Sequence, residues 1–91
     1  MVIEDLYRKF NELMNKRNYP RVAYVDRVPP QRVLDSWCED MTMYTPVKDL
    51  QWTLVGEDPK LCRQLCVMAM CIKIAKEQGM AAATLYKLQQ G

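Results

Sequence analysis

The chain of 91 residues contains no histidine and a single serine, Ser36. Histidine is the usual base that activates a serine or cysteine nucleophile near neutral pH, so the commonest catalytic arrangement is missing. Glycine is also scarce. The three glycines, Gly56, Gly79 and Gly91, stand far apart, which excludes the glycine-rich loops that bind phosphate groups. We therefore expect a protein that is not an enzyme and that uses no cofactor.

The four cysteines favour neither a disulfide framework nor a metal site. Cys62, Cys66 and Cys71 lie on one predicted helix, where a rotation of about 100° per residue turns Cys71 roughly 180° away from Cys62. Thiolates on opposite sides of a helix cannot bind one ion, and structural zinc needs four ligands. We expect no metal site, and thiols that pack as small hydrophobic side chains.

The sequence shows neither a secretory signal nor a membrane-spanning segment. Its first seventeen residues carry seven charged side chains, which interrupt any apolar targeting sequence. The unbroken apolar run at 65–72 is much shorter than the about 20 residues that span a bilayer. Reduced cysteines are typical of a reducing compartment. These features predict an intracellular protein, cytoplasmic or nuclear, that is neither secreted nor transmembrane.

The same apolar run is the strongest indication of the fold. A helix that is apolar on every side must be surrounded by protein, whereas a helix with one apolar stripe packs against one surface. The composition, 49% hydrophobic and 26% charged, is typical of a soluble globular domain. We predict a single helical domain over residues 1–91, an all-α compact bundle of about five helices around a central buried helix at about 59–78.

Capping residues and apolar spacing predict where the helices begin and end. The first helix covers about 2–17, and Pro30 begins a second that places Trp37 in the core. Thr45-Pro46 and Asp58-Pro59 are typical of helix starts, and a glycine is typical of a helix end. The resulting third, fourth and fifth helices cover about 46–56, 59–78 and 80–90. The last of them is expected to turn Ala81, Thr84, Leu85 and Leu88 toward the core.

A basic segment between Lys16 and Arg32 is the first candidate site. It holds five basic residues and one acidic residue, a net charge of +4, while the whole chain carries +2. Arginines with interleaved tyrosines are typical of surfaces that bind nucleic acid or acidic lipid. The alternative is an ordinary charged loop, neutralised by acidic residues of the second helix. The candidate anion-binding residues are Lys16, Arg17, Arg21, Arg27, Arg32, Tyr19 and Tyr24.

Two aromatic residues form the second candidate site. Trp52 and Tyr86 lie off the apolar faces of their predicted helices, and exposed aromatic side chains are favoured at protein interfaces. The primary hypothesis is a non-enzymatic interaction or assembly module that binds a protein partner or copies of itself, with no small-molecule substrate. The alternative is a module that binds RNA, DNA or an acidic membrane surface through residues 16–32.

The order of these elements resembles the layout of retroviral matrix domains. The resemblance lies in five short helices, a basic stretch after the first helix and a buried fourth helix, and it covers no sequence motif. Val2 departs from the myristoylated glycine of many such domains. The terminal Gln90-Gly91 is similar to a viral polyprotein cleavage junction. Together these features imply a viral structural protein, associated with a matrix or a nucleocapsid.

Overall fold

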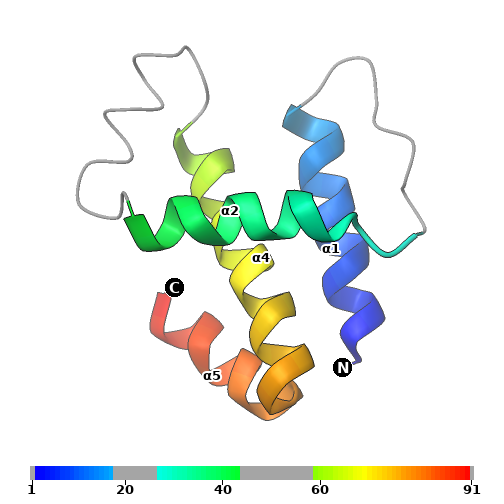
Figure 1. The fold of residues 1–91 in the computed structure, drawn as a ribbon, viewed down its shortest axis with the longest axis vertical. Helices are drawn as coiled ribbons and strands as arrows, with labels where there is room; N and C mark the ends of the chain where they lie inside the picture. The colour runs from blue at the N-terminus through cyan, green and yellow to red at the C-terminus, as the bar shows by residue number, and fades with distance from the viewer. Residues whose placement is uncertain (1, 18–26, 44–58, 91) are drawn as a thin grey trace.

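The computed structural model describes residues 2–17, 27–43 and 59–90, and within these ranges every regular element is a helix. The elements are α1 (Ile3–Arg17), α2 (Gln31–Met43), α4 (Pro59–Gln78) and α5 (Met80–Gln90) (Figure 1). The prediction of an all-α fold is confirmed. The helix predicted at 46–56 lies outside the described residues.

The helix α4 is the centre of the fold. It packs against α1, α2 and α5, and Figure 1 shows α2 crossing its front face with α1 and α5 on either side. In the apolar run at 65–72, Val67 and Met70 are half-buried and all the other side chains are buried. This confirms the prediction of a central buried helix. None of the helices in the described ranges, α4 included, is both long and apolar enough to cross a membrane.

The helices α1 and α2 contribute the apolar stripes that their spacing predicts. The side chain of Trp37 is only 8% exposed, which confirms its predicted place in the core. All four cysteines are buried as well, in keeping with their expected role as small hydrophobic side chains. The core residues of these two helices are Leu6, Phe10, Leu13 and Met14 of α1 and Leu34, Trp37 and Cys38 of α2.

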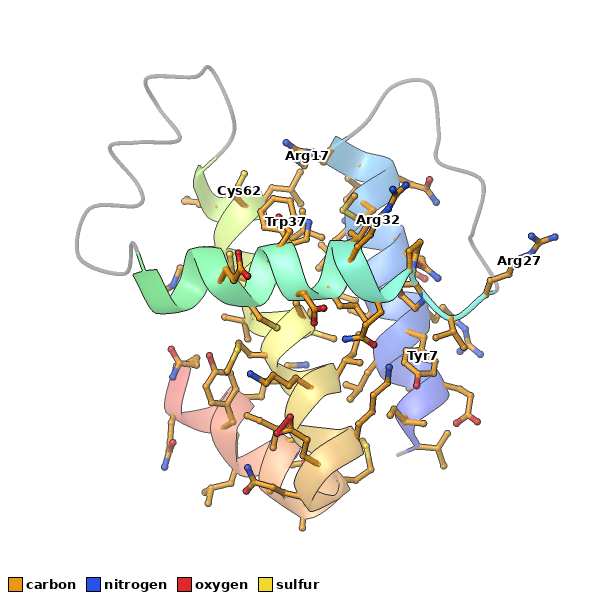
Figure 2. The ribbon with its side chains drawn as sticks, in the orientation of Figure 1. Tyr7, Arg17, Arg27, Arg32, Trp37 and Cys62 are labelled. Carbon is orange, nitrogen blue, oxygen red and sulfur yellow. The ribbon has the colours of Figure 1, made fainter. Side chains whose placement is uncertain are left out.

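Polar contacts join the elements at the edges of this core. The buried amide of Asn11 donates a hydrogen bond of 2.8 Å from Nδ2 to the carbonyl oxygen of Arg27, which ties α1 to the segment before α2. The guanidinium of Arg17 lies 5.1 Å from the ring centre of Trp37 (Figure 2), a cation–π contact between α1 and α2. At the start of α2, Lys76 of α4 donates to the side-chain oxygen of Gln31 over 3.2 Å.

Local chemistry sets the helix ends. The carbonyl oxygen of Pro30 accepts the first hydrogen bonds of α2, from the backbone N–H groups of Val33 and Leu34. The helix α4 ends at Gly79, whose φ of 96° lies in the left-handed region and whose N–H donates to the carbonyl oxygen of Ala75 over 3.1 Å. Glycine adopts this conformation at little cost, so the predicted helix end is confirmed.

The predicted orientation of the last helix is wrong. Ala81 and Thr84 are exposed, and Leu85 and Leu88 are 58% and 74% exposed. The buried residue of α5 is instead Ala83, which is 2% exposed, and the half-buried Met80 and Tyr86 pack against the core beside it. The physical reason is the connection to α4. Gly79 is its only residue, so the turn fixes which face of α5 meets α4, and the apolar stripe of α5 does not decide it.

Candidate anion-binding pocket

One face of the first half of α4 is not covered by another of the described helices. Its residues Lys60, Arg63, Gln64 and Val67 recur at spacings of three and four, which places them on one side of the helix. A pocket of about 420 Å³ lies between this face, α1 and α5. Its volume falls within the range of roughly 300–1,000 Å³ that is typical of ligand pockets.

The pocket combines an apolar floor with a cationic rim. The floor consists of the buried side chains Leu13 and Met68 together with the half-buried Val67. Two amide side chains, Gln64 and Gln90, add hydrogen-bonding groups. Among residues 2–17, 27–43 and 59–90, no carboxylate lines the pocket. Its cations come from three helices: Lys9 of α1, Lys60 and Arg63 of α4, and Lys87 of α5.

The rim cations also act on groups in the core. Burial raises the pKa of the Cys71 thiol, and the positive charge of Lys87 opposes this shift. Burial likewise raises the pKa of the Tyr86 hydroxyl, with Arg63 again opposing. The positive charges of Lys87 and Arg63 thus lower the pKa values of two groups on the core side of the pocket, although burial outweighs them.

The lining chemistry indicates the class of ligand. Cations attract an anionic group, and Arg63 can bind a phosphate or carboxylate through two parallel hydrogen bonds. The floor offers aliphatic and thioether side chains, which suit a hydrocarbon chain. In the described part of the chain, no aromatic ring on which a nucleic-acid base could stack lines the pocket. The arrangement therefore suits an anion that carries an aliphatic chain.

The basic segment predicted from the sequence does not contribute to this pocket. Of its members in the described ranges, Arg17 lies over Trp37, while Lys16 and Arg32 are exposed. Figure 2 shows Arg27 pointing away from the helices. None of these four lines the pocket. Tyr19, Arg21 and Tyr24 lie outside the described residues, so the role of this segment stays a prediction.

Of the two aromatic residues predicted at a protein interface, the structure describes only Tyr86. Trp52 lies outside the described residues. Tyr86 is half-buried and packs against the core, beside the buried Ala83 face of α5. Only part of its side chain is accessible, and its role in an interface stays a prediction.

The cysteines are placed for packing. Within the described ranges, no group of three cysteine, aspartate or glutamate residues lies close enough together to hold a metal ion. Burial raises the pKa of the Cys38 thiol from 9.0 to about 11. A thiol with such a pKa is almost wholly protonated at neutral pH and is a poor nucleophile.

The pocket was not predicted from the sequence, because the cations that line it are distant from one another in the sequence and come from three helices. One signal was available. The polar positions Lys60, Arg63 and Gln64 share a face of the fourth helix, which shows that its first half is not apolar all round. No family model, curated protein or solved structure matches this chain, so the site itself carries the functional argument.

Proposed function

We propose that the chain is a non-catalytic helical binding module whose pocket binds an amphipathic anion, an acidic head group joined to an aliphatic chain. The observation that carries this proposal is the rim of Lys9, Arg63 and Lys87 above the apolar floor, with no carboxylate among the lining residues that the structure describes. The ligand is bound and not turned over. The proposal therefore keeps the non-enzymatic role expected from the sequence but gives the anion a different site.

The two halves of the pocket favour different parts of the ligand. A hydrocarbon chain that covers Leu13, Val67 and Met68 gains about 25 cal/mol for each Å² of apolar surface removed from water. The cations add a smaller contribution, because the rim is open to solvent and salt screens it. An alkyl anion should thus bind more tightly than inorganic phosphate, which offers only the charge.

Titration with octyl phosphate tests this function. We expect saturable binding by isothermal calorimetry, no comparable binding of inorganic phosphate, and a loss of roughly tenfold in affinity for Arg63→Gln, in keeping with a charged hydrogen bond of about 1.5–3 kcal/mol. Arg32→Gln is the matched control, because it removes the same group from α2, outside the pocket.

The control also separates the two anion sites. If Arg32→Gln weakens binding and Arg63→Gln does not, the basic segment of residues 16–32 holds the anion and the pocket does not. If octyl phosphate does not bind at all, the proposed function is wrong.

A further inference from the structure

The outward face of α5 is an apolar stripe that the described helices do not cover. Ala81, Thr84, Leu85 and Leu88 recur at spacings of three and four, and all of them are exposed. Leu88 is 74% exposed and Leu85 58%, whereas the small Ala83 occupies the core side of the same helix. This helix therefore turns both of its leucines away from the core, while Ala83 and the half-buried Met80 and Tyr86 pack against it.

The stripe and the pocket lie next to each other on α5. Lys87 lines the pocket, and it comes four residues after the core-facing Ala83 and three after the exposed Thr84. It therefore lies at the border between the two faces. Thr84 precedes Lys87 by three residues and Leu88 follows Thr84 by four. One edge of the exposed stripe therefore adjoins Lys87, with Leu85 at the far edge. The stripe thus has a cation along one border, and α5 itself contains no acidic residue.

We propose that this combined surface docks onto an acidic lipid bilayer, with Leu85 and Leu88 inserted among the head groups and with Lys87, Arg63 and Lys9 facing lipid phosphates. The inference rests on the proposed function, and it names the source of the anion as lipid within a membrane. A helix with an apolar face and cationic flanks is the kind that lies in a membrane interface. The negative surface potential of an acidic bilayer attracts cations that lie close to it.

Charge and area favour a bilayer over a second copy of the chain. A second copy would bring another cationic rim against the first, and like charges repel. A stable protein interface also buries about 800 Å² on each partner, and the stripe offers four side chains of which two are small. A bilayer has no such lower limit on area, and its acidic lipids complement the rim.

Vesicle co-sedimentation with the full chain tests the proposal. We expect binding to phosphatidylcholine vesicles that contain phosphatidylserine, little binding to phosphatidylcholine alone, and weaker binding at high salt. Changing both Leu85→Gln and Leu88→Gln should reduce vesicle affinity by roughly tenfold or more, since two inserted leucine side chains are lost. Octyl phosphate affinity should stay unchanged, because neither leucine lines the pocket.

The matched control is Val28→Gln. Val28 is 59% exposed, like Leu85, but it belongs to the segment that leads into α2, and Figure 1 shows this end of α2 on the side away from α5. Its replacement should leave vesicle binding unchanged. Because all three side chains are exposed, the variants should fold like the parent, which circular dichroism checks.

Other results would overturn the inference in distinguishable ways. If octyl phosphate binds but acidic vesicles do not, or if the double leucine variant binds vesicles as well as the parent, the pocket function stands and membrane docking is wrong. If sedimentation shows a dimer that the double variant abolishes, the stripe belongs to a second copy. If neither octyl phosphate nor vesicles bind, both proposals fall.

Discussion

At the scale of single residues, Gly79 determines how the last two helices meet. It is the only residue between α4 and α5, and its φ of 96° lies in the region that side chains with a Cβ disfavour. A Cβ added there would meet no atom within 4 Å. The requirement for glycine therefore comes from the backbone conformation and not from crowding.

Replacing this glycine should have a cost that depends on the backbone alone. We expect Gly79→Ala to lower the free energy of unfolding by about 1 kcal/mol, and Gly79→Asn to lower it less, because asparagine tolerates the left-handed region better. Urea denaturation of the three proteins measures both differences. Equal stability of the alanine variant and the parent would show that the turn does not need a positive φ.

The Cys38 thiol should make the fold sensitive to alkaline pH. Its pKa is raised from 9.0 to about 11, mainly by burial, while Lys73 acts in the opposite direction. Above pH 9 the unfolded chain releases this proton and the folded chain keeps it, so the unfolded state binds fewer protons and stability falls as pH rises.

We expect the contribution of Cys38 to be fully present below pH 9 and to decline by about 2–3 kcal/mol as the pH rises to 11. Burial raises the pKa values of Cys71 and Tyr86 too, so the control is Cys38→Ala, whose stability should fall less steeply over this window. Urea denaturation at a series of pH values provides the comparison. Parallel curves for the two proteins would contradict the assignment.

At the scale of whole elements, the fold depends on α4 and on the side of α5 that faces it. Leu65 of α4 is fully buried, whereas Leu88 of α5 is 74% exposed although it belongs to the apolar stripe of its helix. Leucine thus occupies two opposite environments. The loss of unfolding free energy on replacing each leucine by alanine shows which helix face lies in the core.

We expect Leu65→Ala to cost about 2–5 kcal/mol of unfolding free energy, since it leaves a cavity in a packed core. Leu88→Ala should change stability by less than about 0.5 kcal/mol. Thermal and urea unfolding of both variants measure the difference. A large loss for Leu88→Ala would mean that the apolar stripe of α5 faces the core after all.

Sequence patterns predicted the elements that local chemistry specifies. The stripes of Phe10 and Leu13 on α1 and of Leu34 on α2 follow from spacing alone, and Pro30 and Gly79 mark a start and an end through backbone restrictions that neighbouring elements do not change. The central place of α4 also follows from its own sequence, because a helix that is apolar on all sides must be covered by other elements.

The orientation of α5 and the pocket could not be predicted in this way. Both depend on how the elements are placed in space. The turn at Gly79 overrides the stripe of Leu85 and Leu88, and the pocket brings Lys9 and Lys87 together from opposite ends of the sequence. A run of basic residues can be recognised in a sequence, but a cluster of basic residues from three helices can be recognised only once the fold is known.

At the scale of the whole molecule, α4 has a core side and an open face. Its core side packs against α1, α2 and α5, and the contact between Arg17 and Trp37 joins α1 to α2. Its open face carries the pocket, where α1, α4 and α5 each contribute at least one cation. The pocket thus lies at the edge of the apolar core and shares Leu13 and Met68 with it, and there we propose that an amphipathic anion binds.

The most direct test of that site is methyl NMR during an octyl phosphate titration. We expect saturable shifts at the methyl groups of Leu13, Val67 and Met68, which form the pocket floor, with one dissociation constant for all three. The methyl groups of Leu34, buried on α2 and outside the pocket, should shift far less. Linear shifts without saturation at the floor, or the largest shifts at Leu34, would contradict the binding of an amphipathic anion in this pocket.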